Sequence, residues 1–431
     1  MSPRRLAVAD RPSLVGQEFE LEVGPVAHGG HCVARIPEGP AAGEVAFVRH
    51  ALPGERVRIR VTEDGASSFC RADAIAVLDP APERVAAPCP ASGPGACGGC
   101  DWQHVSAEGQ RALKAAVIRE QFQRLAGLPV SVTVEELPGG LLGWRTRTVY
   151  SVAPDGRMGL LRHRSDRVYP LSQCLIGAPG VGDPSALSTR VIGADRVELA
   201  RGDDASAAVL AHRTAPAVRR GRGRRRPDEV RVVAGPAALR HHVSDRLFTV
   251  AAGGFWQVHP RIAEELVKAV VAATEPRAGE TVLDLYAGAG LFTAVMADLV
   301  GATGRVVGVE ISAQAVADAA SNLSGLSHAE VRQGSVGADS IAGLELAPDL
   351  VILDPPRAGA GPSVMAAVAA LNPRAVCYVA CDPASLARDV ATAVNLGWRL
   401  RALRAFDAFP MTAHIECVAL LEPASTRLPS P

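Results

Sequence analysis

The chain has 431 residues, more than one ordinary domain holds, so we expect two or three domains. Apolar residues make up 48% and charged residues 21%, which is close to globular averages and excludes disordered, collagen-like and coiled-coil chains. Basic and acidic residues number 45 each, so no overall positive field attracts nucleic acid or membrane. Apolar runs are too short to span a membrane and no secretory segment begins the chain, which predicts a cytoplasmic protein.

The first segment of the chain alternates apolar and polar residues. Between Ser13 and Asp79 these short stretches are broken by Gly and Pro, a pattern typical of a small antiparallel β-barrel. The strings Gly29-Gly-His-Cys-Val-Ala-Arg35 and His50-Ala-Leu-Pro-Gly-Glu-Arg-Val57 resemble the TRAM module, an OB-like barrel that binds RNA. A generic β-barrel used for protein contacts is the alternative.

A cysteine-rich segment follows the barrel. Residues Pro88–Val105 are dense in Cys, Gly and Pro, and the apolar spacing of Ser106–Leu125 predicts a helix. Bunched cysteines in a reducing compartment usually bind metal or do chemistry. Four of them are candidate metal ligands: Cys89, Cys97, Cys100 and Cys174. Zinc and an iron–sulfur cluster both fit four thiolates, and the spacing by itself does not decide between them.

The middle of the chain mixes short strand-like segments with loops over residues 129–255. It includes the arginine-rich run Arg219–Arg226, punctuated by glycine. Such runs are mostly solvated loops, and contact with RNA phosphates is the alternative.

From Phe255 onward, apolar strands alternate with Ala-rich helices, which predicts a doubly wound parallel sheet of the α/β class. A cofactor is expected at the carboxyl ends of its strands. The predicted strands are Thr281–Tyr286, Arg305–Glu310, Glu330–Gln333, Leu350–Leu353, Ala375–Ala380 and Ile415–Leu421.

The string Asp284-Leu-Tyr-Ala-Gly-Ala-Gly290 leads from the first of these strands into a Gly-x-Gly turn. Its glycines let backbone approach a ligand closely, and Asp284 can accept hydrogen bonds or brace the loop. The next strand ends at Glu310, whose carboxylate can accept from both hydroxyls of a ribose. A dinucleotide oxidoreductase and an S-adenosylmethionine-dependent methyltransferase both fit. The missing third glycine of the pyrophosphate fingerprint favours the ligand without phosphate.

Cys381 follows another strand and precedes a helix, and we expect the helix start to lower its thiol pKa. A buried structural cysteine is the alternative. A methyltransferase has a use for a thiolate because uracil C5 is a poor nucleophile until a thiolate adds to C6. The C5 proton must then be removed, and Glu416 is a candidate base if a dry pocket raises its pKa. An ordinary carboxylate at a strand end is the alternative for Glu416.

Over nearly its whole length the sequence resembles the RNA uracil-5-methyltransferase family of TrmA/RumA-type enzymes. The matching motifs are Gly254-Phe-Trp-Gln-Val258, Asp284–Gly290, Leu353-Asp-Pro-Pro-Arg-Ala-Gly359, Ala380-Cys-Asp-Pro383 and His414-Ile-Glu416. The resemblance implies that Cys381 is the nucleophile and Glu416 the base. It further implies a set of residues around S-adenosylmethionine and the uracil. The predicted cofactor residues, which include the two loop glycines, are Gln257, Asp284, Tyr286, Gly288, Gly290, Glu310, Ser335 and Asp354.

This chain departs from the family in two motifs. Family members commonly have Ser-Cys-Asn-Pro where this chain has Ala380-Cys-Asp-Pro383, and an Asn in place of Leu291. The string Cys97-Gly-Gly-Cys-Asp-Trp-Gln-His104 resembles the family's [4Fe-4S] segment, which favours iron–sulfur over zinc. A TRAM-like barrel together with cysteines resembles the branch that acts on ribosomal RNA.

The sequence thus predicts three domains: a TRAM-like OB barrel that binds RNA over residues 1–82, a central α+β domain with iron–sulfur cysteines and RNA contacts over 83–254, and a class I, Rossmann-like methyltransferase domain over 255–431. The expected protein is a monomer that methylates C5 of a uridine in RNA, with ribosomal RNA favoured over transfer RNA. Three alternatives remain: a cytosine-5 RNA methyltransferase, a non-catalytic RNA-binding protein with this fold and an NAD-dependent dehydrogenase.

Overall fold

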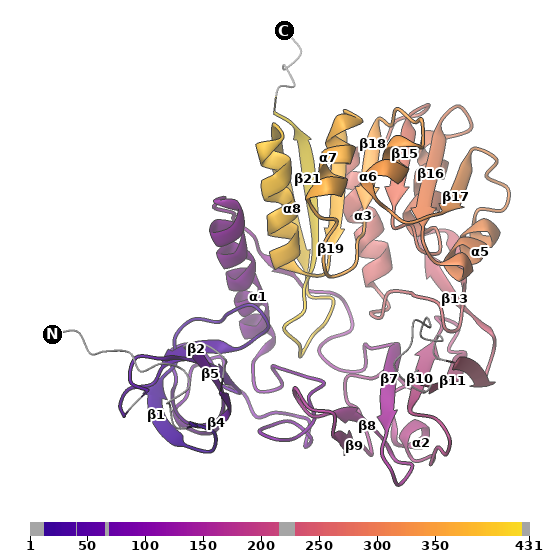
Figure 1. Cartoon of the computed structure of the whole chain (residues 1–431). Coiled ribbons are helices and arrows are strands. Elements are labelled where there is room, and N and C mark those ends of the chain that lie inside the picture. Colours follow the sequence, from indigo (N-terminus) through magenta and orange to yellow (C-terminus); the bar gives the residue numbers. More distant parts are fainter. Residues whose placement is uncertain (1–12, 40, 65–68, 215–228, 425–431) are drawn as a thin grey trace, which may run out of the picture. The chain divides into compact units, whose positions relative to one another are not determined.

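The computed structural model describes residues 13–39, 41–64, 69–214 and 229–424 (Figure 1). The run Arg219–Arg226 lies outside the described residues. The chain divides into two compact units. Unit 1 comprises Met1–Val117, Leu161–Arg167 and Pro410–Ala413, and unit 2 comprises Ile118–Leu160, Val168–Phe409 and His414–Pro431. Among the helices in the described ranges, none is long and apolar enough to cross a membrane.

Unit 1 contains a curled five-stranded sheet in the order β1-β4-β5-β3-β2 (Figure 1). Alternate residues of β4 are buried because side chains of a strand point to opposite faces, and Val57, Ile59 and Val61 enter the core. Strands β3 and β5 run parallel, so the expectation of a wholly antiparallel barrel is wrong at this pair. The five strands are β1 (Glu18–Glu22), β2 (Cys32–Arg35), β3 (Val45–Arg49), β4 (Arg56–Asp64) and β5 (Phe69–Asp79).

The segment Pro410–Ala413 belongs to unit 1 although it connects two strands of unit 2. The amides of Asp101 and Trp102 each donate to the carbonyl of Met411 at 3.0 Å. The Asp101 carboxylate accepts from the amide of Ala413 at 3.0 Å. The predicted helix is present as α1 (Ala107–Gln121), which runs from unit 1 into unit 2 and ends in a π-helical turn, η2 (Phe122–Ala126).

The amino-terminal part of unit 2 is built on a six-stranded sheet in the order β12-β11-β10-β7-β8-β9, with the separate hairpin β13-β14. A short helix, α2 (Pro184–Leu187), begins at Asp183, whose carboxylate accepts from the amide of Ala186. The strands are β7 (Arg147–Val152), β8 (Met158–Leu161), β9 (Val168–Pro170), β10 (Arg196–Arg201), β11 (Ala207–Arg213), β12 (Glu229–Ala234), β13 (Ala238–Val243) and β14 (Arg246–Ala251).

The rest of unit 2 is an eight-stranded sheet in the order β17-β16-β15-β18-β19-β21-β20-β6, with α7 and α8 on one face and α3 on the other (Figure 1). Its central strands are buried on both faces, as expected for parallel strands covered by helices. The strands are β6 (Val134–Glu135), β15 (Thr281–Leu285), β16 (Arg305–Glu310), β17 (Ala329–Gln333), β18 (Leu350–Leu353), β19 (Ala375–Ala380), β20 (Trp398–Phe406) and β21 (Glu416–Pro423). The helices are α3 (Ile262–Thr274), α4 (Leu291–Val300), α5 (Ala313–Asn322), α6 (Ala338–Ala342), α7 (Pro362–Ala370) and α8 (Pro383–Asn395).

The prediction of a parallel sheet is wrong at strand β21, which lies between β19 and β20. Strand β21 runs antiparallel to both β19 and β20. A short connection joins β20 to β21 without a helix, and strands joined in this way run antiparallel. Strand β20 was not predicted, although the alternation of apolar residues and arginines in Trp398–Phe406 is the ordinary signal of a half-buried strand.

Candidate active site

Five of the predicted site residues lie on the side of the large sheet where its parallel strands have their carboxyl ends. Strands β15, β16, β18 and β19 are parallel, so the residues at their carboxyl ends share that edge, among them Tyr286, Glu310, Asp354 and Cys381. Glu416 reaches the same edge from β21, which runs the other way. Ala380 pairs with Cys417, and continuing this antiparallel register by one residue sets Cys381 opposite Glu416.

The loop after β15 has the backbone conformation that its glycines predict. Gly288 and Gly290 have φ angles of +54° and +84°, a region that disfavours residues with a Cβ. A Cβ on Gly290 would lie 3.3 Å from the Cβ of Ala319, so α5 closes that side of the loop. A Cβ on Gly288 would meet nothing within 4 Å. The backbone at Gly288 therefore borders open space in which a ligand can approach.

Glu310 is tied to this loop by its carboxylate. One oxygen accepts from the amide of Gly288 at 3.0 Å and the other accepts from the amide of Ser312 at 2.7 Å. The backbone carbonyl of Glu310 accepts from the amide of Gly334 at 2.9 Å, which brings Ser335 close to the end of β16. The predicted cofactor residues Gly288, Glu310 and Ser335 thus belong to neighbouring strand ends.

Asp284 lies beneath the loop and is fully buried. Its Oδ2 accepts from the hydroxyl of Thr293 at 2.6 Å, while Oδ1 has no hydrogen-bond partner among the described residues. Burial raises the pKa of Asp284 to about 6. This placement favours a bracing role, in which Asp284 fixes the start of α4, over direct contact with a cofactor.

Three carboxyl groups, those of Asp284, Asp354 and Glu416, interact at the carboxyl ends of the strands. Burial raises the pKa of Asp354 to about 7, and the carboxylate of Asp284 adds to the effect. Burial and then the charge of Asp354 raise the pKa of Glu416 well above its ordinary value, while Arg357 opposes the rise. The predicted pKa rise of Glu416 is therefore confirmed. Arg357 was not singled out from the sequence, although it stands in the Asp-Pro-Pro-Arg motif.

The expectation of a lowered thiol pKa at Cys381 is wrong. Burial, followed by the charge of Glu416, raises the pKa of Cys381 to about 11, and Arg357 lowers it only in part. The start of α8 offers little compensation because Asp382 caps it, with its carboxylate accepting from the amide of Ser385 at 2.7 Å. The cap adds a negative charge next to the thiol and occupies a helix amide.

The loop after β18 depends on Asp389, which was not predicted as a site residue from the sequence. Asp389 is buried on α8 and accepts hydrogen bonds from the amides of Ala360 at 2.8 Å and Gly361 at 3.1 Å. It also accepts from the hydroxyl of Tyr378 at 2.6 Å. Asp389 therefore holds the end of the loop that carries Asp354. Asp389 lies about one helical turn from both Leu386 and Ala393 on α8, and an acid at this apolar spacing was the available signal.

Gln257 lies in a segment that is fixed on both sides. The indole of Trp256 stacks on the ring of His241 with 4.7 Å between centroids. The carbonyl of Val258 accepts from both the amide and the hydroxyl of Thr146, at 2.8 and 2.9 Å. This support defines the backbone on either side of Gln257, and its contact with a cofactor stays a prediction.

The predicted metal ligands fall into both units. In unit 1 the sulfur of Cys97 accepts from the amide of Gly99 at 3.4 Å, and the sulfur of Cys100 accepts from the side-chain amide of Gln103 at 3.3 Å. Cys89 belongs to the same unit, whereas Cys174 is buried in unit 2. Within the described ranges, no three His, Cys, Asp or Glu side chains are grouped to hold a metal ion. The four-cysteine cluster therefore stays a prediction.

Several known proteins resemble this chain in sequence or in fold. The family model for tRNA (uracil-5-)-methyltransferase matches residues 237–424, and the TRAM domain model matches residues 12–74. A protein of Streptomyces coelicolor described as an RNA methyltransferase is 45% identical, covering 98% of this chain and 96% of its own length. The RlmD 23S rRNA (uracil(1939)-C(5))-methyltransferase of Alkalilimnicola ehrlichii is 33% identical, with coverage of 96% and 98%.

A solved structure shows the same fold. It is that of the Pyrococcus abyssi tRNA (uracil-54, C5)-methyltransferase in complex with S-adenosyl-L-homocysteine. The match has a TM-score of 0.65 and 21% identity, and it covers 93% of this chain and 99% of that one. The TRAM domain and the methyltransferase fold predicted from the sequence are confirmed. This chain belongs to the family of S-adenosylmethionine-dependent RNA uracil-5-methyltransferases.

Proposed function

We propose that this enzyme methylates C5 of a uridine in RNA through a transient covalent bond between Cys381 and C6 of the base. The observation that carries the proposal is the register of β19 and β21, which sets Cys381 opposite Glu416 at the cofactor edge of the sheet. The nucleophile and the base must both reach the same pyrimidine ring, because one attacks its C6 and the other removes the proton from its C5.

In the first step, the thiolate of Cys381 attacks C6 of the uracil ring. The electrons of the C5–C6 double bond move into an enolate, and C5 becomes nucleophilic. S-adenosylmethionine supplies an electrophilic methyl group, which C5 displaces from the sulfonium. Glu416 then takes the C5 proton, the C5–C6 double bond re-forms, and the bond to the sulfur of Cys381 breaks.

Arg357 adjusts both reacting groups. Its charge lowers the pKa of the Cys381 thiol and of the Glu416 carboxyl, and both must be deprotonated to act. Burial pushes in the opposite direction and makes Glu416 a stronger base once it is ionised. Glu416 is buried and Cys381 is half-buried, so the ionised pair would combine a strong base with a strongly nucleophilic thiolate.

The residues around the loop after β15 fit S-adenosylmethionine. Open space borders Gly288, and the carboxylate of Glu310 lies beside it, suited to accept from ribose hydroxyls. The proposed cofactor set is Gln257, Tyr286, Gly288, Gly290, Glu310, Ser335 and Asp354, with Asp284 as a brace. No pyrophosphate-binding third glycine is present in the loop, which disfavours the dehydrogenase alternative.

Ribosomal RNA is the proposed substrate, supported by the 33% identity to the 23S rRNA enzyme across nearly the whole chain. We further propose three domains: a barrel (1–82), a central domain (83–254) and a catalytic domain (255–431). The proposed enzyme is a cytoplasmic monomer. An iron–sulfur cluster on Cys89, Cys97, Cys100 and Cys174 is part of it. Amide donors to the sulfurs of Cys97 and Cys100 suit metal-bound thiolates.

A pair of variants tests the proposal. A 23S rRNA transcript made with 5-fluorouridine has no C5 proton to lose, so the wild type should form a covalent RNA adduct that resists denaturing electrophoresis. Cys381→Ala should form none. Glu416→Gln should accumulate an adduct even on ordinary RNA, because the thiol is expelled only after the C5 proton leaves. Methylation by both variants should fall by about a thousandfold or more.

Cys377→Ala is the matched control, because Cys377 is buried on β19, the strand that ends just before Cys381. This variant should remain active. Methylation by Cys381→Ala at the wild-type rate would rule out the covalent mechanism. Release of tritium from RNA labelled at C5 of cytidine, and not of uridine, would identify the cytosine-5 enzyme. A wild type that forms no adduct would favour the non-catalytic alternative.

A further inference from the structure

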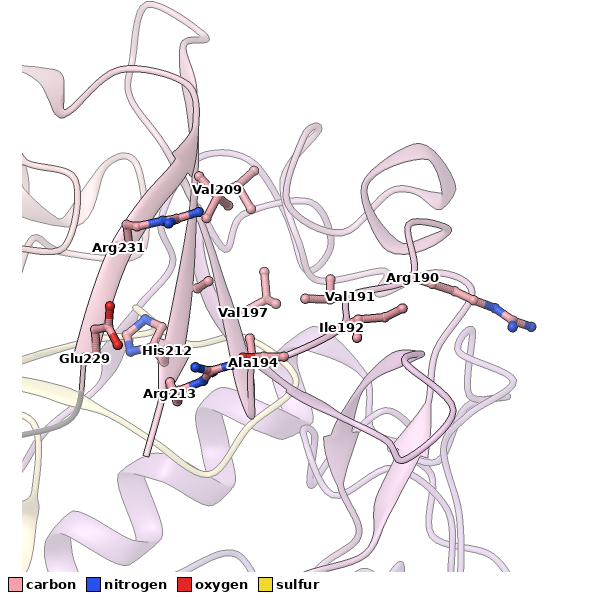
Figure 2. A pocket seen from close by; sticks show the side chains of 13 residues that line it. Arg190, Val191, Ile192, Ala194, Val197, Val209, His212, Arg213, Glu229 and Arg231 are labelled. Atoms are coloured by element: carbon pink, nitrogen blue, oxygen red, sulfur yellow. Dashed lines mark hydrogen bonds between the residues drawn. The ribbon is translucent and has the colours of Figure 1, made fainter. Parts of the chain in front are cut away.

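One face of the β10-β11-β12 sheet points away from the core of unit 2. Along β11, Leu210 is buried and packs with Leu239, so Val209, Ala211 and Arg213 point to the opposite face. Arg231 pairs with Ala211 across the ladder and shares that face. A hollow of about 420 Å³ lies on that face (Figure 2). Its lining residues fall between positions 190 and 233, before the strands of the large sheet that carry the predicted site.

The far wall of the hollow is residues 190–194, and hydrogen bonds fasten this wall to β11. The amide of Asp195 donates to the carbonyl of His212 at 2.9 Å. The carboxylate of Asp195 accepts from the amide of Thr214 at 2.6 Å, and Arg213 Nε donates to the carbonyl of Gly193 at 3.0 Å. The hollow is therefore a fixed feature of this sheet, comparable in volume to a small ligand site.

The lining combines an apolar floor with a basic rim. The floor is aliphatic: Val197, Val209, Ala211 and Val233. At the lip, Ile192 is 94% exposed, so a large apolar side chain stands almost wholly in solvent. Arg213 and Arg231 extend from the strands toward the hollow (Figure 2). Arg190, on the opposite wall, points away from the hollow. Arg213 and Arg231 flank one acid of the lining, Glu229, and the carboxylate of Asp195 also interacts with Arg213.

The side chains at the hollow therefore combine two guanidinium groups with an aliphatic surface. The guanidinium group matches the geometry of phosphate oxygens. Phosphate groups thus suit the two arginines, and the apolar floor suits the face of a base or ribose.

We propose that this hollow binds a single-stranded segment of the substrate RNA, with phosphates on Arg213 and Arg231 and a sugar or base against the aliphatic floor. The inference rests on the proposed function, which makes RNA the substrate. Its consequence is that the six-stranded sheet contributes affinity for RNA without taking part in methyl transfer.

The experiment compares Arg231→Ser and the double variant Arg213→Ser/Arg231→Ser with the wild type. Binding of fluorescein-labelled oligouridylate is measured over a range of salt concentrations. Each lost phosphate contact should lower the slope of log affinity against log salt by about 0.7, and affinity at low salt should fall about threefold to tenfold per arginine. At saturating 23S rRNA transcript, kcat should stay within about twofold while KM rises.

Arg401→Ser is the matched control, because Arg401 is exposed on β20 of the other sheet and should not change the salt slope. Arg231 lies on the exposed edge strand, so the single variant keeps the test valid if the double variant unfolds. Unchanged affinity and slope in Arg231→Ser would overturn the inference. Binding is measured without methyl transfer, so an inactive wild type would overturn the proposed function while this comparison still decides the inference.

Discussion

At the scale of single residues, the thiol of Cys381 is less acidic than its position before a helix suggests. Its pKa is raised to about 11, first by burial and then by the charge of Glu416. Burial disfavours the charged form of any group, and a nearby like charge adds to that cost. Most of the enzyme therefore carries a protonated thiol at neutral pH, and Arg357 is the described cation that opposes this.

The raised pKa predicts how adduct formation depends on pH. The thiolate fraction increases as pH rises toward a pKa of about 11, so the single-turnover rate of adduct formation with 5-fluorouridine RNA should increase up to about tenfold per pH unit between pH 6 and 9. Arg357→Met should slow the reaction at every pH, because loss of its charge raises the thiol pKa further. Arg357→Lys keeps the charge and should react faster than Arg357→Met. A rate independent of pH would contradict this assignment.

At the scale of elements, the strand ends carry the reacting groups and a helix supports the loop between them. Asp389 on α8 accepts hydrogen bonds from the amides of Ala360 and Gly361, close in sequence to Asp354 and Arg357. Hydrogen bonds to a charged acceptor contribute more than neutral ones, and a buried amide that loses its partner is costly. The loop after β18 is thus defined by a side chain from a different element.

Asp389→Ala should lower kcat/KM by about tenfold to a hundredfold, because a displaced loop misplaces Asp354 and Arg357. Tyr378→Phe is the comparison variant, since it removes the hydroxyl that donates to Asp389 and accepts from the amide of Ala360 at 3.0 Å, while both amide bonds to the Asp389 carboxylate stay in place. Thermal unfolding should show both variants folded, with the larger loss of stability in Asp389→Ala. Wild-type kinetics in a folded Asp389→Ala protein would show that the loop does not depend on this carboxylate.

At the scale of the whole molecule, the predicted iron–sulfur cluster joins cysteines that the chain distributes between two units. Protein purified without oxygen should hold about four iron atoms per chain with visible absorption if the cluster is [4Fe-4S], whereas one colourless zinc ion would support the alternative. Cys97→Ser and Cys174→Ser should each lose most of the metal. Cys70→Ala is the control, because Cys70 is buried in the barrel core. Full metal content in Cys97→Ser would remove that residue from the ligand set.

The sequence by itself was enough for the local features of this protein. Alternating residues predicted the barrel, and the Gly-x-Gly turn with a following acid predicted the loop that Glu310 now closes on Gly288. Cys381 and Glu416 could be selected because each stands in a short motif beside a strand end. Such features depend on backbone conformation and on neighbours within a few residues, which a sequence pattern records directly.

Only the tertiary structure decided what distant segments do to one another. The antiparallel placement of β21 sets Glu416 opposite Cys381, and Asp389 reaches the loop after β18 from another helix. The sign of the thiol pKa shift followed from burial and from Glu416, not from the adjacent helix start that the sequence shows. Desolvation and charge interactions depend on distances through the folded protein, and those distances are independent of separation along the chain.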